Sequence, residues 1–329
     1  MLYSVLKLFF CNKIIIISNT MQMISLTEFI YVHKSFQKKF SDFIIICPYT
    51  DNQVFKKIKS CHKEFIAKNN LILNFHKKIE IKILYLVLAV KKLFNLKIKQ
   101  IIIGNLYSNL SKRYLEISKE VFVLDDGTNL LEKQHIKFIK KKKYSFFSCF
   151  DRKFFPKNHY KKNNFEFFKN KFIDKKKSSK DILILGRWIL GDKNPLLSDK
   201  QFYYVIEYIK DKFKNKNIYY FPHPRENTYS LEKRFRSIKF IKSEYPIEIY
   251  FLKMKKKPKT IVSFNSSAVI PLKSFDKKLN IFNIYFKIKL NNDHYWKKYL
   301  PRELSTVNYF RSKLSIKSKI LELPNIDGT

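Results

Sequence analysis

Residues 218–226, IYYFPHPRE, contain the pattern that decides the fold prediction for this chain. The run opens with four apolar or aromatic residues, as a short buried β-strand does, and it ends in a rigid polar turn. Residues 121–127 (VFVLDDG) and residues 260–267 (TIVSFNSS) repeat the arrangement. Apolar runs that each end in a polar cluster are typical of a parallel sheet with a binding site at its strand ends.

Short apolar segments alternate with helical patterns in both halves of the chain. In the first half we predict strands at residues 13–18, 43–47, 100–103 and 121–124, and helices at residues 21–36, 52–68 and 106–117. In the second half we predict strands at residues 181–185, 218–221, 260–264 and 279–286, and helices at residues 201–213 and 267–274. This alternation predicts an α/β fold with parallel sheets covered on both faces.

The two halves predict two doubly wound, Rossmann-like domains that face each other across a cleft. We place an N-terminal α/β domain at residues 1–150, a basic linker at 151–180 and a C-terminal α/β domain at 181–329. The apolar N-terminus is interrupted by Lys7 and Lys13, and we predict that it is a first strand rather than a signal peptide.

The chain is strongly basic, with 67 Lys and Arg against 27 Asp and Glu and a net charge of +40. Such a field attracts polyanions such as nucleic acid, anionic lipid or phosphorylated glycans, although compositional drift on solvated faces is an equally good explanation. The excess is uneven, because residues 133–180 contain sixteen Lys and one Arg against three acids. The aromatic residues of this stretch still require a core to pack into.

The four cysteines, Cys11, Cys47, Cys61 and Cys149, have no spacing of a zinc or redox motif. Small buried hydrophobic residues are the better interpretation, and the pattern fits a reducing, cytoplasmic compartment. No segment reaches the run of about 18 apolar residues that a membrane-spanning helix needs.

Asp125, Asp126 and Gly127 follow the strand predicted at residues 121–124. A carboxylate at this position could accept the proton of an attacking hydroxyl, and adjacent acids raise each other's proton affinity. The same residues also fit an ordinary Asp-Gly turn, so both interpretations stay open.

His223 stands between Pro222 and Pro224, which restrict the backbone on both sides of its imidazole. A histidine aimed in this way can donate a hydrogen bond or a proton to a departing phosphate. Arg225 could add charge-assisted contacts to a phosphate or carboxylate. A purely structural histidine is the alternative.

Ser266 and Ser267 lie where a predicted strand passes into a helix, and such a junction can hold an anion or simply cap the helix. Gly186, one of five glycines, ends the strand predicted at residues 181–185 and is expected to permit close approach. Asp192 and Asp199 are reserve bases, although Asp199 also suits the first turn of a helix. Without a Gly-rich loop, an Asp-x-Asp pair or His/Cys metal spacing, we expect chemistry that uses neither metal nor cofactor.

The ordered set Asp-Asp-Gly, His-Pro and Ser-Ser resembles the signature of bacterial sialyltransferases. Residues 219–226 are most similar to the lipooligosaccharide sialyltransferase family, and the resemblance covers residues 95–290. It implies a GT-B fold, CMP-sialic acid as donor, a terminal galactose of a lipooligosaccharide or other surface glycan as acceptor, and inverting, metal-independent transfer.

The resemblance also implies roles for individual residues. His223 would engage the phosphate as general acid, and Ser266 and Ser267 would bind that phosphate. To this donor side we add Gly186, Pro224 and Arg225 on the residue chemistry given above. The general base would be Asp125 or Asp126 in the pattern of most related families. In the lipooligosaccharide group it would instead be an acid upstream of the His-Pro motif, here Asp199 or Asp192.

Two other functions stay open: a glycosyltransferase of the same fold with another nucleotide-sugar donor, and a basic nucleic-acid-binding protein. No recognised nucleic-acid-binding module is present, so we expect no specific nucleic-acid partner. We expect a cytoplasmic protein, and we leave open a homodimer and peripheral contact with an anionic inner membrane.

Overall fold

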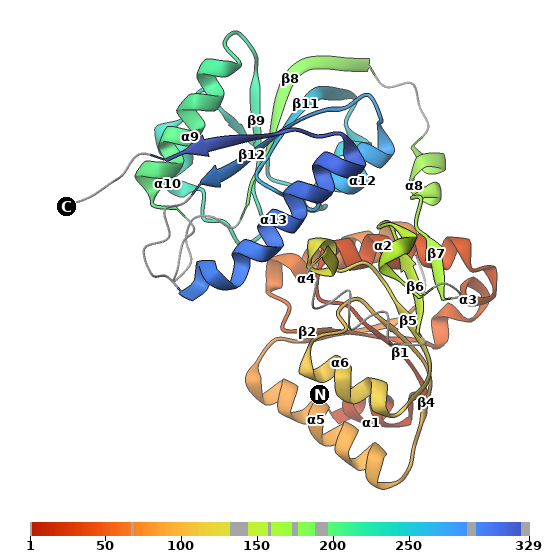
Figure 1. The fold of residues 1–329 in the computed structure, drawn as a ribbon. Coiled ribbons are helices and arrows are strands. Elements are labelled where there is room, and N and C mark those ends of the chain that lie inside the picture. The colour runs from red at the N-terminus through yellow and green to blue at the C-terminus, as the bar shows by residue number, and fades with distance from the viewer. Residues whose placement is uncertain are drawn as a thin grey trace. The chain divides into compact units, whose positions relative to one another are not determined.

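The computed structural model describes residues 2–66, 69–131, 144–156, 159–172, 177–187, 197–287 and 294–323. The chain forms two compact units, Met1–Lys171 and Phe172–Thr329. Each unit is built on one parallel sheet with helices (Figure 1). The predicted α/β class and the two doubly wound domains are therefore confirmed. The boundary differs from the prediction, because residues 151–171 belong to the first unit rather than to a linker.

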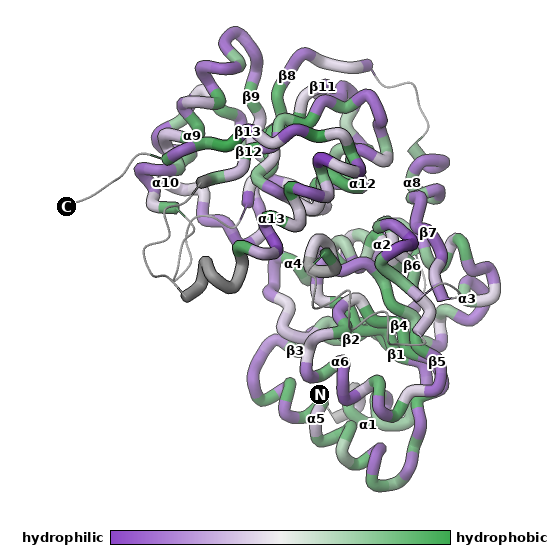
Figure 2. Tube along the Cα trace, in the orientation of Figure 1, coloured by the Kyte–Doolittle hydropathy of each residue, from purple (hydrophilic) through white to green (hydrophobic). Residues whose placement is uncertain are grey.

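The first sheet has the strand order β3-β2-β1-β4-β5-β6-β7. Its strands are β1 (Lys13–Ile16), β2 (Ile44–Pro48), β3 (Leu71–Phe75), β4 (Ile98–Ile103), β5 (Ser118–Val123), β6 (Ser145–Ser148) and β7 (Tyr160–Lys162). The order reverses between β1 and β4, where Ile14 pairs with Ile101. These central strands are the most hydrophobic part of the unit (Figure 2), and their isoleucines are buried. Because both faces are covered, the strands are continuously apolar rather than alternating.

Helices surround this sheet, and some differ from the prediction. The α-helices are α1 (Leu2–Phe10), α2 (Thr20–Val32), α3 (Lys34–Lys39), α4 (Asn52–Cys61), α5 (Lys78–Leu93), α6 (Asn109–Glu116) and α8 (Glu166–Lys171). The short helical turns are η1 (Phe40–Asp42), η2 (His62–Ile66), η3 (Gly127–Leu131) and η4 (Arg152–Phe154). The prediction of a strand before Lys13 was wrong, because residues 2–10 form α1, which buries Leu8. Strand β3 and helix α5 were not predicted.

The basic stretch contributes to the first sheet and its core. Strand β6 pairs with β5, and β7 pairs with β6. Buried aromatic rings anchor the stretch, and they are Phe146, Phe147, Phe155, Phe165 and Phe168. The predicted linker therefore supplies core residues, because burying this much aromatic surface outweighs the repulsion among its exposed lysines.

Helix α8 is joined to α2 by a buried carboxylate. Glu28 of α2 accepts the backbone N–H groups of Phe167 at 3.1 Å and Phe168 at 2.9 Å. These groups have no partner within their own helix, so Glu28 acts as a cap supplied by another element. Burial raises the pKa of Glu28 to about 7, although the two backbone hydrogen bonds oppose the shift.

The second sheet has the strand order β10-β9-β8-β11-β12-β13. Its strands are β8 (Lys177–Leu185), β9 (Ile218–Phe221), β10 (Lys239–Phe240), β11 (Lys256–Ser263), β12 (Asn280–Lys287) and β13 (Ser318–Glu322). Its helices are α9 (Asp199–Lys212), α10 (Tyr229–Arg234), α11 (Ile247–Lys253), α12 (Val269–Phe275) and α13 (His294–Leu314). The order reverses between β8 and β11, and such a switch point is where ligands bind in open α/β sheets.

The backbone of this glycine-poor chain adopts left-handed conformations at residues other than glycine. Among the described residues, six non-glycine positions have positive φ: Tyr49, Asn95, Phe165, Asn215, Asn265 and Ser315. Three of the six are asparagine, which tolerates this conformation better than other residues with a Cβ atom. Within the described part of the chain, no helix is long and apolar enough to cross a membrane.

Candidate active site

Three of the predicted motifs meet at one edge of the second sheet. Gly186 follows β8, the His-Pro turn follows β9, and the serine cluster follows β11. Strand β8 pairs with β9 on one side and with β11 on the other, so the three motifs leave adjacent parallel strands at their carboxyl ends. The structure therefore brings Gly186, His223 and the Ser266–Ser267 pair to the switch point of this unit.

The His-Pro turn is held by Glu226, whose carboxylate is enclosed. Glu226 Oε2 accepts the backbone N–H of His223 at 3.0 Å, and Oε1 accepts the hydroxyl of Tyr220 at 2.5 Å. The N–H of Glu226 in turn donates to the carbonyl of His223 at 2.9 Å. Burial raises the pKa of Glu226 to about 7, while its hydrogen bonds from Tyr220 and His223 lower it.

The orientation of the His223 ring follows from one further bond. The backbone N–H of Arg225 donates to Nδ1 of His223 at 3.2 Å, so Nδ1 acts as an acceptor and the neutral ring carries its proton on Nε2. His223 is half-buried, while the side chain of Arg225 is exposed. A half-buried imidazole with an Nε2–H donor is suited to bind an anion.

Gly186 is explained by close packing against this turn. A Cβ atom at Gly186 would lie 2.8 Å from the backbone nitrogen of His223 and 2.8 Å from the carbonyl oxygen of Phe221. It would overlap the carboxylate of Glu226 as well. The absence of a side chain at Gly186 therefore lets Glu226 reach the His-Pro turn; whether Gly186 also contacts a donor stays a prediction.

The serine cluster forms a tight turn before α12. Ser263 is buried and its hydroxyl accepts the N–H of Ser266 at 3.1 Å, while Asn265 has a φ of 56°. The carbonyls of Ser266 and Ser267 accept the N–H groups of Val269 and Ile270, as expected at the start of a helix. Both serines are half-buried, and the Ser266 hydroxyl accepts the N–H of Ala268 at 3.4 Å.

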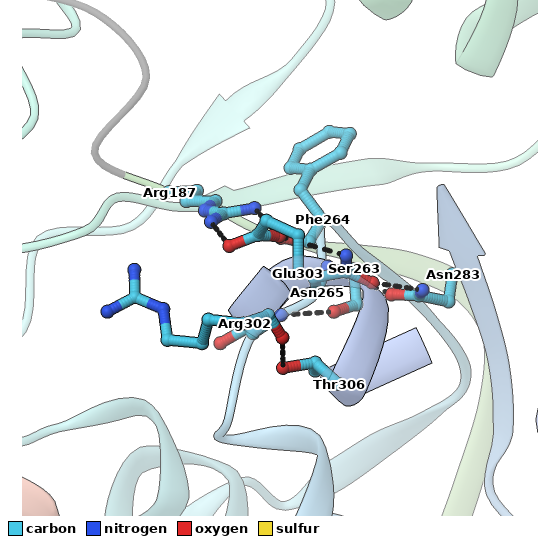
Figure 3. A network of polar contacts seen from close by, with 9 residues as sticks. Arg187, Ser263, Phe264, Asn265, Asn283, Arg302, Glu303 and Thr306 are labelled. Carbon is cyan, nitrogen blue, oxygen red and sulfur yellow. Dashed lines mark hydrogen bonds and ion pairs between the residues drawn. The ribbon is translucent and has the colours of Figure 1, made fainter. Parts of the chain in front are cut away.

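A buried polar network supports the serine turn, and sequence reasoning did not predict it (Figure 3). Arg187, directly after Gly186, donates to the carbonyl of Phe264 at 2.9 Å and forms a two-point ion pair with Glu303 of α13. Asn265 donates to Glu303 at 3.0 Å and exchanges two hydrogen bonds with Asn283 of β12. Burial alone would raise the pKa of Glu303, but the charge of Arg187 and the hydrogen bonds keep it below its ordinary value.

The Asp-Asp-Gly cluster belongs to the first unit and follows β5. Asp125 is fully buried, and it accepts hydrogen bonds from Cys149 N–H at 2.9 Å, Ser25 Oγ at 3.4 Å and Ser148 Oγ. Burial raises the pKa of Asp125, although its hydrogen bonds with Ser148 and Cys149 oppose the shift. These contacts tie β5 to β6, which is a structural role.

Asp126 has a different environment at the switch point of the first sheet. Its Oδ1 accepts amide hydrogens from Asn19 at 3.0 Å and from Gln22 at 2.5 Å. Asn19 is also the N-cap of α2, and Gln22 lies in the first turn of that helix. Both amides that orient Asp126 therefore follow the carboxyl end of β1, the strand that pairs with β4. Asp126 is 6% exposed, whereas Asp125 is 0% exposed. Two oriented amide donors stabilise the ionised carboxylate that a base requires.

Asp199 lies exposed in the first turn of α9, after the N-cap Ser198. A capping box begins this helix, because the Ser198 hydroxyl accepts the N–H of Gln201 at 3.2 Å and Gln201 Oε1 accepts the N–H of Ser198 at 3.1 Å. An acid in this position complements the helix dipole, and no contact ties Asp199 to the His-Pro turn in the described residues. Asp192 lies outside the described residues.

Comparison with known proteins relates the part of the chain that contains this site to a family of glycosyltransferases. Residues 132–288 match the model of glycosyltransferase family 52. This span contains Gly186, His223, Ser266 and Ser267, four of the site residues predicted from the sequence. No curated protein matches the chain in sequence.

Solved structures with a similar fold are distant in sequence. The 2,6-sialyltransferase of Photobacterium sp. JT-ISH-224, in complex with CMP and lactose, is 11% identical over 94% of this chain and 78% of that chain, with a TM-score of 0.54. The sialyltransferase of Photobacterium damsela is 10% identical over 94% and 81%, with a TM-score of 0.47. Acinetobacter baumannii MurG is 8% identical over 94% and 85%, with a TM-score of 0.48.

The fold and the family match together define a glycosyltransferase with two Rossmann-like domains of the GT-B class. The chain is thus an enzyme of the glycosyltransferase kind, and the match of residues 132–288 to family 52 agrees with the resemblance of its His-Pro and Ser-Ser motifs. The interpretation as a basic nucleic-acid-binding protein is not supported.

Proposed function

We propose that this enzyme transfers sialic acid from CMP-sialic acid to a terminal galactose of a lipooligosaccharide or another surface glycan. Transfer proceeds with inversion and without a metal ion. The observation that carries the proposal is the meeting of Gly186, His223 and the serine pair on three adjacent strand ends within the span that matches family 52. CMP-sialic acid carries a phosphate and a carboxylate, and both suit a chain with a net charge of +40.

His223 and the serine turn bind the phosphate of the donor. The Nε2–H of His223 donates to a phosphate oxygen, because Nδ1 is already used by the N–H of Arg225. Ser266 and Ser267 add hydroxyl donors, and the exposed Arg225 adds charge, while Pro224 keeps the turn rigid. Since negative charge grows on the phosphate as the glycosidic bond breaks, these contacts strengthen toward the transition state.

We propose a narrower role for His223 than proton donation. A general acid would need a second ring proton on Nδ1, and that atom accepts the Arg225 N–H at 3.2 Å. We therefore place His223 as a hydrogen-bond donor that stabilises the departing phosphate. CMP is a weakly basic leaving group, so stabilisation by hydrogen bonds suffices for its departure.

Asp126 is the general base in this proposal, in preference to Asp125 and Asp199. Asp125 uses both carboxylate oxygens to hold β6, and Asp199 has its role at the start of α9. Asp126 removes the proton from the galactose hydroxyl, and the oxygen attacks the anomeric carbon of sialic acid. The bond to the phosphate oxygen breaks with its electron pair, and CMP leaves.

Release of CMP from CMP-sialic acid in the presence of a soluble galactoside tests the proposal. We expect acceptor-dependent release by the wild type and loss of it in His223→Ala. The matched control is His159→Ala. His159 lies before the amino end of β7, whereas His223 follows the carboxyl end of β9, so His159 should be dispensable for transfer. Release that is equal in His223→Ala and in the wild type would contradict the site.

The donor class is tested by inhibition. If CMP inhibits and UDP and GDP do not, the CMP-linked donor is supported. If the folded wild type releases no CMP, and UDP inhibits transfer from a UDP-sugar that the enzyme does use, the alternative of another nucleotide-sugar donor takes its place.

A further inference from the structure

Helices α1 and α5 expose apolar side chains that the proposed reaction does not use. Eight of the fourteen large hydrophobic residues that are exposed in the described part of the chain lie on these helices or in the turn after α5. They are Tyr3, Leu6, Phe10, Ile79, Leu86, Leu93, Phe94 and Leu96. We call this set the α1–α5 apolar face. A cluster of this kind marks an interaction site more often than chance exposure.

The spacing of these residues shows that they form stripes rather than isolated contacts. Ile79, Leu86 and Leu93 are seven residues apart, so they lie on one side of α5. They are 61%, 64% and 80% exposed, while Ile81, Leu84, Val87 and Leu88 of the same helix are buried against the unit. Helix α5 is thus apolar on both sides, which is unusual for a helix in contact with water.

The two helices pack against each other at the buried Lys91. Lys91 of α5 donates to the carbonyl of Cys11 at 3.0 Å, and its Nζ lies 5.7 Å from the ring centre of Phe9. On α1, Tyr3, Leu6 and Phe10 follow helical spacing and are 65%, 49% and 77% exposed. Figure 1 shows α1 and α5 together with α6 on the same side of the first sheet.

Lysines interrupt and border this face. Residues 77–99 contain seven lysines and one acid, Glu80. Glu80 is occupied with the start of its own helix, since it accepts the N–H groups of His76 and Lys77 at 2.8 Å each. Lys82 lies between Ile79 and Leu86 on the exposed side, and Lys7 stands 4.8 Å over the ring of Tyr3. Long lysine side chains can bury their methylene groups while the ammonium reaches outward.

We propose that the α1–α5 apolar face docks on the surface of an anionic lipid membrane. Apolar side chains enter the boundary between headgroups and acyl chains, and the lysines bind the acidic headgroups. Charge argues for lipid and against a second copy of the chain, because two such basic faces would repel each other. Helix α5 has 16 residues and lies in the plane of the interface instead of crossing the bilayer.

Co-sedimentation of the full chain with vesicles of phosphatidylcholine, with and without phosphatidylglycerol, tests this surface. We expect the wild type to bind the anionic vesicles and to bind the neutral vesicles more weakly. In the double variant Leu86→Glu/Leu93→Glu, binding should fall by roughly tenfold or more, because two anchors are replaced by charges that anionic lipid repels. Ile320→Glu is the matched control, since Ile320 is an exposed residue on β13 of the second unit.

A second variant separates charge from apolar contact. Lys7→Glu/Lys82→Glu should weaken binding to anionic vesicles and leave the weak binding to neutral vesicles unchanged. Thermal unfolding confirms that each variant is folded, independently of any transferase activity. Failure of the wild type to bind, or binding of Leu86→Glu/Leu93→Glu equal to that of the wild type, would overturn the proposal. The proposal would also be overturned if the wild type is a dimer without lipid and Leu86→Glu/Leu93→Glu is a monomer. The α1–α5 apolar face would then bind a second copy of the chain.

Discussion

Glu226 holds His223 by its backbone and leaves the imidazole to other contacts. Oε2 of Glu226 accepts the His223 N–H at 3.0 Å, and the Glu226 N–H donates to the His223 carbonyl at 2.9 Å. Both residues belong to the same turn, so the motif carries its own support. A histidine whose main chain is fixed from two sides loses little freedom when it binds a phosphate.

Replacement of Glu226 should reduce turnover more than donor affinity. In Glu226→Ala the N–H of His223 and the buried hydroxyl of Tyr220 both lose their acceptor, so the turn shifts. Because a displacement of about 1 Å at a reacting group can reduce the rate by roughly 100-fold, we expect kcat to fall by roughly 10–100-fold. Steady-state CMP release measures kcat and the KM for the donor separately.

Tyr220→Phe is the control for this experiment. This variant removes the hydroxyl that donates a hydrogen bond to Glu226. It keeps the hydrogen bond from the His223 N–H to Glu226. It should retain most of the wild-type kcat. A Glu226→Ala enzyme with unchanged kcat would show that His223 does not depend on this carboxylate.

The ion pair between Arg187 and Glu303 should be strongly coupled. Arg187→Met leaves the carboxylate of Glu303 buried without its main partner, and breaking such a pair costs roughly 3 kcal/mol. The double variant Arg187→Met/Glu303→Met removes both charges and should recover much of that loss. Urea unfolding of the wild type, both single variants and the double variant gives the coupling free energy. Strictly additive losses would show that the pair contributes little.

Substitution of the two aspartates of the Asp-Asp-Gly cluster should have different effects, on catalysis at Asp126 and on stability at Asp125. Asp126→Asn should unfold near the wild-type temperature and lose roughly 10²–10⁴-fold in kcat, because an amide cannot accept a proton. Asp125→Asn should lower the free energy of unfolding by roughly 1–3 kcal/mol, because its amide cannot accept from all of Ser25, Ser148 and Cys149. CMP release per folded molecule and urea unfolding distinguish the two effects. An inactive but fully stable Asp125→Asn would reverse the assignment.

The buried carboxyl of Glu28 should make stability depend on pH. Its pKa is about 7 in the folded protein against an ordinary value of 4.5, so the folded chain keeps a proton that the unfolded chain loses between these values. The free energy of unfolding should therefore fall as the pH rises from 4.5 to about 7. Glu28→Gln, which cannot titrate, should make this slope shallower in urea unfolding measured across that range. The buried Glu226, whose pKa is also about 7, should account for part of the slope that remains. Glu80→Gln, in which a half-buried helix-capping glutamate is replaced, controls for the loss of a cap.

Sequence patterns predicted the strands that carry the site because those strands are short, apolar and bounded by turn residues. Residues 43–47, 100–103 and 218–221 fall on observed strands within a residue or two, whereas β11 begins at Lys256, four residues before the predicted strand at 260–264. The pattern failed at α1 and α5, where apolar residues lie on the exposed side as well as on the buried side. Their exposed leucines and aromatics face outward, so the usual contrast between buried and solvated faces is absent.

Residue chemistry located His223, the serine pair and the aspartate cluster, but it could not show what supports them. Arg187 and Glu303 are 116 positions apart and meet only in the folded chain. One local signal was available, since Arg187 directly follows the glycine at the end of β8. Glu226 was visible within the quoted motif, and its role depends on the enclosed carboxylate that a sequence does not reveal.

Two left-handed turns of this chain are positions where a substitution should raise its stability. Asn95 and Asn215 have φ values of 52° and 63° and lie outside the candidate site. Glycine adopts this conformation without a steric penalty, and even asparagine bears part of a cost of roughly 1 kcal/mol. Placing glycine at these two turns therefore offers a route to a more stable enzyme that leaves its core and its candidate site unchanged.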